Sequence, residues 1–328
     1  DILGEYENEC DEEDALEELN KMEEIGKIED KFRQEKESLE NKYKEQIEEY
    51  ENKLKQMAQN PDKENCYSKA YDIVINGGSR AFVQYDPVIV DSVLGTKTYN
   101  MGIDGSAINR QILKYEAYCR AHKRAPKLLI QNIDFVTLQL TQDFDREQFF
   151  PYVWNDRELF DSISRYETYT IYDRYLPLVR YFGYHNLLRS GLFSSLVGTV
   201  EPYNGYGPQE REWDGSLFAQ QESIGLSNVP EARQLFDDFI GHVKKSGTQV
   251  VFVYAPVYGE VNTRMHNLQE MYDLFDDIAQ KYDVPILNYN EIEMTLDTAY
   301  FYNALHMNKL GAEKFTRMLV EELKTLYK

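Results

Sequence analysis

Residues 73–82 read IVINGGSRAF, an apolar run followed by two glycines, a serine and an arginine. The β-branched run predicts a short buried strand, and the glycines end it. Such a turn can hold a phosphate, expose a nucleophile or reverse the chain. A phosphate cradle needs GxGxxG or GxxxxGK(S/T), and a nucleophile elbow needs GxSxG. None of these three patterns is present at this turn. What remains is Ser79 at the start of the next helix, beside backbone N–H groups that can stabilise an anion.

Downstream of this turn, short apolar runs alternate with amphipathic helical patterns as far as the C-terminus. Four further strands are predicted within residues 97–105, 125–135, 248–258 and 284–290. This alternation predicts βαβ units, and hence a three-layer α/β/α fold with a parallel sheet covered by helices on both faces over residues 63–328. Ligands of such sheets bind at the carboxyl ends of the strands. The GGSR turn, the GIDG loop and the residues after Pro256 are therefore expected at one rim.

Residues 141–225 interrupt this alternation. They contain nine tyrosines between Tyr152 and Tyr206, both tryptophans and the loop PYNGYGPQ. A long insertion at the rim of an α/β sheet is typical of a lid or a substrate wall. The alternative is that these rings pack a helical subdomain against the sheet. We expect most of them to pack in this way and a few to line a ligand surface.

The first 62 residues differ in character from the rest. Residues 11–59 lack proline and are rich in Glu, Lys, Gln and Asn, and their apolar residues from Tyr43 to Met57 recur at steps of four and three. This is the spacing of a coiled-coil seam. It predicts a helical or coiled-coil stalk over residues 1–62, which is either a solvated single helix or a helix that pairs with a copy of itself or with a partner.

Charge, cysteine content and hydropathy restrict the classes of partner and compartment. The formal net charge is −21, of which residues 1–70 contribute −12 (11 basic minus 23 acidic residues). Nucleic acid and anionic membrane surfaces are therefore unfavourable partners. Three cysteines without a CxxC pair permit at most one disulfide, and no run of residues is long and apolar enough to span a membrane. The chain begins at Asp1 without a signal peptide, and we expect an upstream targeting or anchoring segment.

A serine nucleophile needs a base, and the sequence has five histidines. His306 lies in a loop just before the final helical pattern, three residues after Asn303, where a side chain can reach Nδ1 and hold the tautomer. A histidine considered alone is more often structural, so pairing His306 with Ser79 needs support from other motifs. Charged, aromatic or helical surroundings favour surface or structural roles for the others, His122, His185, His242 and His266.

Three blocks of the sequence together resemble the SGNH/GDSL hydrolase superfamily, and within it the bacterial envelope proteins whose nucleophile motif is GSSR. The blocks follow the family's order: GGSR at 77–80, NMGIDG at 100–105 and NALHMNKLGA at 303–312. The last is the most specific, because it fits the pattern (D/N)xxHxNxxGA. The resemblance covers about residues 71–328, with the insertion poorly matched. It implies the SGNH variant of the flavodoxin-like fold and an activity on carboxylic esters.

The resemblance assigns a role to each matching residue. Ser79 is implied as the nucleophile that forms an acyl-enzyme, and His306 as its general base. The backbone N–H groups of Ser79 and Gly105 are implied as donors to the oxyanion. No metal and no organic cofactor are implied.

Two departures from the family pattern bear on activity. Asn303 stands where the superfamily usually has Asp, and an asparagine can orient a histidine but cannot stabilise the imidazolium by charge. Asp297, six residues earlier, is an alternative partner for His306. The family's GxND block, whose Asn completes the oxyanion hole, has no match after the third strand. Asn132 or Asp134 stands at about the right place, and Asn132 is the candidate.

Two hypotheses of different classes follow. The first is a serine esterase or O-acyltransferase that acts on acyl groups of an envelope or extracellular carbohydrate, outside the cytoplasm; aromatic rings of the insertion would stack on sugar faces. The second is a catalytically lapsed binding or assembly protein on the same fold, whose coiled coil binds a partner. Asn303 and the missing GxND favour the second hypothesis, whereas Ser79, His306 and Gly105 favour the first.

Overall fold

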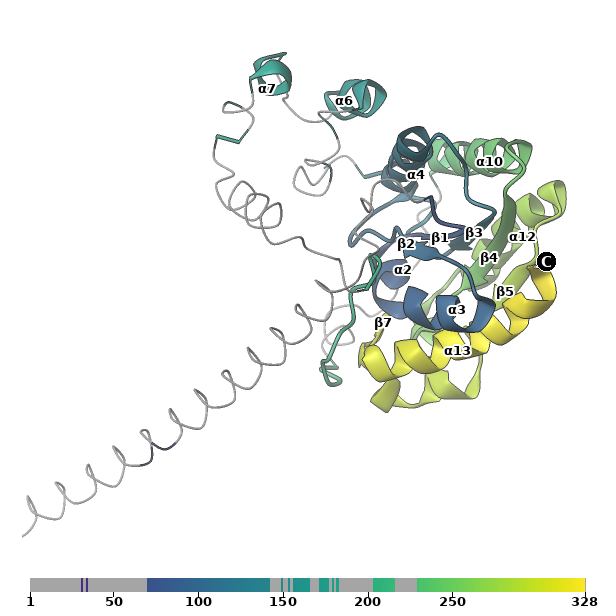
Figure 1. Cartoon of the computed structure of the whole chain (residues 1–328). Helices are drawn as coiled ribbons and strands as arrows, with labels where there is room; N and C mark the ends of the chain where they lie inside the picture. The colour runs from purple at the N-terminus through teal and green to yellow at the C-terminus, as the bar shows by residue number, and fades with distance from the viewer. Residues whose placement is uncertain are drawn as a thin grey trace, which may run out of the picture. The chain divides into compact units, whose positions relative to one another are not determined.

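The chain divides into two compact units, Asp1–Glu64 and Asn65–Lys328. The computed structural model describes residues 70–141, 156–165, 171–176, 203–215 and 229–327, with single residues elsewhere (31, 34, 149, 153, 179, 181 and 182) (Figure 1). Lys31 and Gln34 are helical. Apart from these two, the stalk predicted over 1–62 and its pairing helix over 11–59 lie outside the described residues.

A five-stranded parallel sheet forms the centre of the second unit, as the alternation of strand and helix patterns predicts. Its strand order is β2-β1-β3-β4-β5, and every neighbouring pair is parallel. β1 lies between β2 and β3, so the chain reverses its direction of travel across the sheet at β1. Ligand sites of this fold lie outside the carboxyl end of the strand at that point. The strands are β1 (Ile73–Asn76), β2 (Thr98–Asn100), β3 (Leu128–Asn132), β4 (Gln249–Tyr254) and β5 (Ile286–Asn288).

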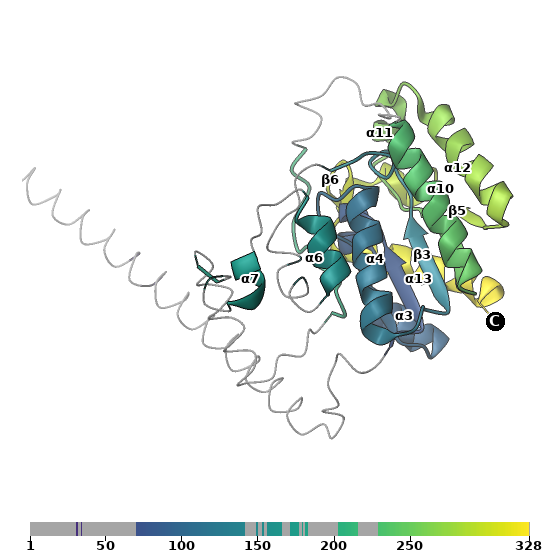
Figure 2. The ribbon, with the colours of Figure 1, turned by 90° about the horizontal axis from the view of Figure 1, so that it is seen from above.

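Helices cover both faces of the sheet, which confirms the predicted three-layer α/β/α class (Figures 1 and 2). Alternate strand residues point to opposite layers: Val74 packs in one core cluster, and Ile73 and Ile75 pack in the other. α4 (Ile108–His122), α10 (Pro230–Lys245) and α12 (Leu268–Tyr282) pack on the first face. On the second face lie α2 (Ser79–Gln84), α3 (Pro87–Leu94) and α13 (Lys309–Leu326).

The apolar residues of FVQYDPVIVDSVLG, residues 82–95, have the spacing of one helix, but the structure forms two helices here. α2 ends at Gln84, and α3 starts with Pro87 at its first turn. Proline disfavours the α conformation in the residue before it, and Asp86 caps the new helix by accepting a hydrogen bond from the Val88 N–H at 2.8 Å. The short α2 therefore carries Ser79 at the rim without a long helix behind it.

The segment after β5 brings the HxNxxGA block to the same rim. It contains the 3-10 helices η2 (Glu293–Leu296) and η3 (Thr298–Tyr300), then the antiparallel pair β6 (Phe301–Asn303) and β7 (His306–Met307). Asn308 caps α13 by accepting from the Gly311 N–H at 3.0 Å, and Gly311 packs directly on the Tyr300 carbonyl. The Asn and Gly of the block therefore fix the start of α13, and His306 lies three residues before its first residue, Lys309.

Part of the insertion packs as a small subdomain. The described residues include α6 (Arg157–Ile163) and α7 (Ile171–Tyr175). Ile103 of the β2–α4 loop is buried together with four residues of the insertion, Phe149, Val153, Leu159 and Ile163. This packing agrees with the structural alternative for this part of the insertion.

A further short helix, α11 (Glu260–Arg264), follows β4. Within the described residues, no helix combines the length and apolar character of a membrane span.

Gly102 is needed because the β2–α4 loop lies directly against α2. A side chain at this position would overlap the backbone of Ala81 and Phe82. We therefore expect Gly102→Ala to lower the free energy of unfolding by about 1–3 kcal/mol in urea denaturation, since the backbone of α2 cannot move aside.

The matched control is Gly259→Ala. Gly259 has a helical φ of −55°, and the nearest atom that a new Cβ would meet is Cδ2 of Leu296 at 3.3 Å. Leu296 is exposed and can move. Equal losses in the two variants would show that the close contact at Gly102 does not matter.

Candidate active site

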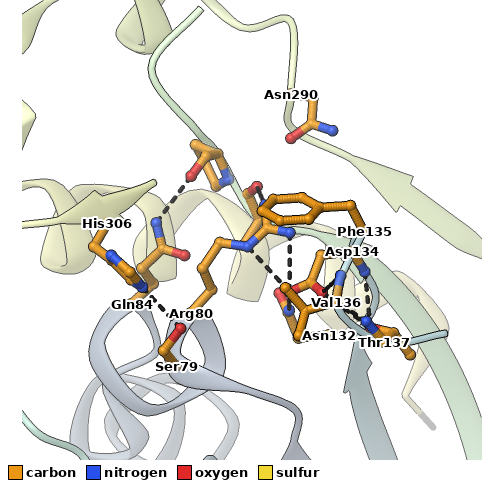
Figure 3. Close-up of polar contacts among 12 residues, drawn as sticks. Ser79, Arg80, Gln84, Asn132, Asp134, Phe135, Val136, Thr137, Asn290 and His306 are labelled. Atoms are coloured by element: carbon orange, nitrogen blue, oxygen red, sulfur yellow. Dashed lines mark hydrogen bonds and ion pairs between the residues drawn. The ribbon is translucent and has the colours of Figure 1, made fainter. Parts of the chain in front are cut away.

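Ser79, His306 and Asn303 form a chain of hydrogen bonds at the carboxyl rim of the sheet. Ser79 Oγ lies 2.8 Å from Nε2 of His306, as Figure 3 shows. Nδ1 of the same ring lies 3.0 Å from Oδ1 of Asn303. The structure thus brings together three predicted site residues, two of them at the far end of the chain from the first.

The bonds around Asn303 determine which tautomer His306 adopts. Oδ1 of Asn303 also accepts hydrogen bonds from the backbone N–H groups of Leu305 and His306, each at 3.0 Å. Because two N–H donors point at this atom, it must be the amide oxygen and not the nitrogen. The Nδ1 atom facing it must then carry the proton. Nε2 is left as the acceptor of the Ser79 hydroxyl proton, which is the arrangement that a general base requires.

The surroundings of His306 keep its ring neutral. Burial, followed by the charges of Arg80 and Arg211, lowers the pKa of His306 to about 4. The Tyr302 ring stacks on the imidazole, with 5.5 Å between ring centroids and 9° between planes. An imidazole with this pKa is an available proton acceptor at any pH above about 4. It is also a weak one, because Asn303 contributes no negative charge.

The two glycine-containing loops meet beside Ser79. The Ile103 N–H donates to the Gly77 carbonyl at 3.1 Å, and a side chain on Gly78 would meet the Ser106 carbonyl at 3.2 Å. Gly77 has a φ of +155°, and its Cβ would lie 2.8 Å from the Cβ atoms of Ala81 and Asn132, so only glycine fits this turn. The structure therefore places the loop that carries Gly105 against the turn that carries Ser79.

The third predicted oxyanion donor, Asn132, is fully buried at the end of β3. Its Oδ1 accepts from the Tyr85 hydroxyl at 2.8 Å, and its Nδ2 donates to Asp134 at 3.0 Å. Both ends of the amide are therefore engaged in the core. This position favours a structural role, and the oxyanion role of Asn132 stays a prediction.

Asp297 is the other residue that the sequence offers as a partner for His306, in place of the aspartate that the SGNH/GDSL pattern usually has at position 303. Its carboxylate accepts from the Ala299 N–H at 2.9 Å and caps η3. Nδ1 of His306 meets Asn303 instead. The Asp297 carboxylate is thus engaged in a local turn, and Asn303 is the residue that partners Nδ1 of His306.

A buried ion pair that the sequence did not predict lies next to Ser79. Arg80 follows Ser79 directly, and its Nη2 and Nε lie 2.9 and 3.1 Å from Oδ2 of Asp134 (Figure 3). Each side chain is only 6% exposed. Oδ1 of Asp134 accepts from the backbone N–H groups of Val136 and Thr137 at 2.9 and 3.0 Å. The sequence does contain a signal for this pair: Arg80 in GGSR and Asp134 in QNID carry opposite charges and follow two neighbouring strands.

This ion pair ties the start of α2 to the ends of two strands. Nη1 of Arg80 also approaches the carbonyl of Ala255, just beyond β4, at 3.5 Å, and its guanidinium lies 5.6 Å from the Phe135 ring centroid. Burial lowers the pKa of Arg80 to about 10, so the side chain stays charged near neutral pH. The Arg80 side chain therefore anchors the backbone next to Ser79 to the segments that follow β3 and β4.

The chain is similar to known proteins only at the level of distantly related solved structures. No protein-family model and no curated protein matches the chain. Among solved structures, a catalytic mutant of an acetylxylan esterase from Geobacillus stearothermophilus is 12% identical, with a TM-score of 0.40 over 78% of this chain and 95% of its own. A GDSL-like lipase from Bacteroides thetaiotaomicron is 11% identical, with a TM-score of 0.35 over 76% and 88%. An acetyl xylan esterase is 10% identical, with a TM-score of 0.40 over 78% and 99%. The resemblance to the SGNH/GDSL superfamily therefore rests on the three sequence blocks and on the site that they form here.

Asp134→Asn tests the importance of the buried ion pair. Asparagine keeps an oxygen for the Val136 and Thr137 N–H groups but removes the charge that compensates Arg80. Leaving one charge of a buried pair alone costs about 3–5 kcal/mol, and we expect a loss of that size in urea denaturation. The control is Asp277→Asn, which breaks an exposed pair with Arg233 (3.4 Å) and should cost less than about 1 kcal/mol. Similar losses in both variants would contradict this interpretation.

Proposed function

We propose that this protein is a serine esterase or O-acyltransferase that acts on acyl groups of an envelope or extracellular carbohydrate. The observation that carries the proposal is the chain of bonds from Ser79 through His306 to Asn303. A serine within 2.8 Å of a neutral, oriented imidazole has the geometry of a nucleophile with its general base. The same two residues at a purely structural site would not need a fixed tautomer.

The reaction proceeds in two steps. Ser79 Oγ bonds to the ester carbonyl carbon as its proton passes to His306 Nε2, and the carbonyl oxygen becomes an oxyanion. The backbone N–H groups of Ser79 and Gly105 are the proposed donors to this oxygen. When the C–O bond to the alcohol breaks, Nε2 returns the proton to the leaving oxygen. Water or a carbohydrate hydroxyl then attacks the acyl-serine, again through Nε2, and Ser79 is regenerated.

The carbohydrate and the extracytoplasmic location are proposals that rest on the family resemblance. The tyrosine-rich insertion supports the first, because aromatic rings stack on sugar faces. Its described part reaches the strand pair that carries His306, because the Asp214 N–H donates to the Tyr302 carbonyl at 3.0 Å, and it includes Tyr203, which is 40% exposed. Esters of carbohydrates are therefore the substrates to test first.

Labelling with a fluorophosphonate tests the nucleophile directly. We expect the wild-type protein to be labelled and Ser79→Ala to lose both labelling and hydrolysis of acetylated sugars, by at least about 10³-fold in rate. Ser92→Ala is the control, because the Ser92 hydroxyl donates to the Ile89 carbonyl on the outer face of α3. Absence of labelling in the wild-type protein would favour the non-catalytic alternative instead.

Asn303→Asp tests whether the missing charge limits the rate. A carboxylate can accept the same three hydrogen bonds and would also stabilise the imidazolium. The wild-type rate should fall only below about pH 4, where His306 becomes protonated. In Asn303→Asp we expect this midpoint to move to higher pH, because a nearby anion raises a histidine pKa, and kcat near pH 7 to rise at least about 10-fold. A lower kcat with an unmoved midpoint would show that Asn303 acts in another way.

A further inference from the structure

Residues 203–215, near the end of the insertion, cross the rim in contact with four parts of the site. The Asn204 carbonyl accepts from the Asn100 N–H at the end of β2, and the Gly207 N–H donates to the Phe82 carbonyl of α2. The Gln209 carbonyl then accepts from the Lys309 N–H at the start of α13. Lastly, the Asp214 N–H donates to the Tyr302 carbonyl of β6 at 3.0 Å. We call residues 203–215 the rim segment.

The rim segment places a cation over the aromatic ring that stacks on His306. The Arg211 guanidinium lies 4.6 Å from the centroid of the Tyr302 ring, and this ring stacks on His306 with 5.5 Å between ring centroids. Tyr302 is buried, and His306 is half-buried. Tyr302 thus contacts both Arg211 of the rim segment and His306. A planar guanidinium on an aromatic face is a favourable cation–π contact.

The charges that face His306 and Tyr302 come from several elements. Arg80 on α2 and Arg211 on the rim segment are the cations that act on His306. Asp104 in the β2–α4 loop and Asp214 on the rim segment are the anions that act on Tyr302. Arg211 also lies 3.4 Å from Asp214, but this pair is exposed on both sides and contributes little by itself. The charges acting on the imidazole itself are therefore positive.

We propose that Arg211 and Tyr302 are positioning residues for His306: Tyr302 holds the plane of the imidazole, and Arg211 opposes its protonation from the rim segment. This inference rests on the proposed esterase or acyltransferase function for its catalytic meaning. It gives the insertion a role that the sequence did not reveal. The insertion supplies one of the two positive charges that act on His306, beside the larger effect of burial, so the acid limit of the proposed reaction depends in part on a segment outside the three family blocks.

The experiment follows the ionisation of His306 with and without catalysis. The pKa of His306 is measured by NMR from its Cε1–H signal in the full chain, and the pH dependence of kcat/KM is measured on an acetylated sugar. Arg211→Gln keeps an amide over the Tyr302 ring and removes the charge. Arg233→Gln is the control, because Arg233 is also an exposed arginine with a carboxylate at 3.4 Å but lies on α10, away from the rim.

We expect Arg211→Gln to raise the pKa of His306 by on the order of half a unit, the effect of one partly screened charge at this range. The acid limb of kcat/KM should move to higher pH by the same amount. Arg233→Gln should leave both unchanged. An unmoved pKa in Arg211→Gln, or an equal shift in Arg233→Gln, would overturn the proposal.

Tyr302 is tested by a pair of variants. Tyr302→Phe keeps the ring and should retain kcat, whereas Tyr302→Leu should lower kcat on the order of 10-fold with little change in KM, because the imidazole plane is no longer held. Equal kcat in Phe and Leu variants would overturn the role of the ring. If the NMR shift occurs in Arg211→Gln but no ester is hydrolysed by the wild-type protein, the proposed function fails and the positioning of His306 stands.

Discussion

The hydrogen bond between Ser79 and His306 joins residues 227 positions apart, and most of the described structure serves to make it. Ser79 needs β1 to end in a turn that only glycine can form, and it needs the β2–α4 loop packed against that turn. His306 needs a short strand pair and a capped helix to end its loop at the same rim. A parallel sheet meets both needs, because the ends of β1 and of the later strands lie on one edge.

The electrostatics of the site differ from those of an aspartate-containing triad. Asn303 orients the imidazole through an oxygen that also accepts two backbone N–H groups, yet it adds no charge, and the positive charges of Arg80 and Arg211 act on the ring. Asn303 therefore orients the His306 ring without stabilising its charged form, whereas an aspartate would do both. His306 remains neutral under mildly acidic conditions, and an imidazolium formed in the proposed reaction would be poorly stabilised. The proposed reaction is therefore expected to tolerate low pH and to have a modest rate at neutral pH.

Strand and helix periodicity and the three blocks were enough to predict the α/β/α class, the shared rim and the pairing of Ser79 with His306 and Asn303. They could not reveal Tyr302 or Arg211, because a stack across a rim depends on where an insertion returns to the sheet. Nor could they show that the Asn132 amide is taken up by Tyr85 and Asp134, since hydrogen-bond partners in a core are not coded by spacing. Pro87 was visible in the sequence, and its effect in dividing α2 from α3 could have been predicted from turn chemistry alone.

Arg80 links these observations. A buried arginine is costly unless it is paired, and here Asp134 provides the pair beside Ser79, while two backbone N–H groups fix Asp134 in turn. The last residue of the GGSR turn is therefore bound to the loop after β3, at the place where the family pattern has GxND. In this chain that loop supplies an anchoring carboxylate, and Asn132 is held within the same network. In the proposed reaction, stabilisation of the oxyanion would then depend more heavily on the backbone N–H groups of Ser79 and Gly105, whose glycine-containing loops meet at the rim.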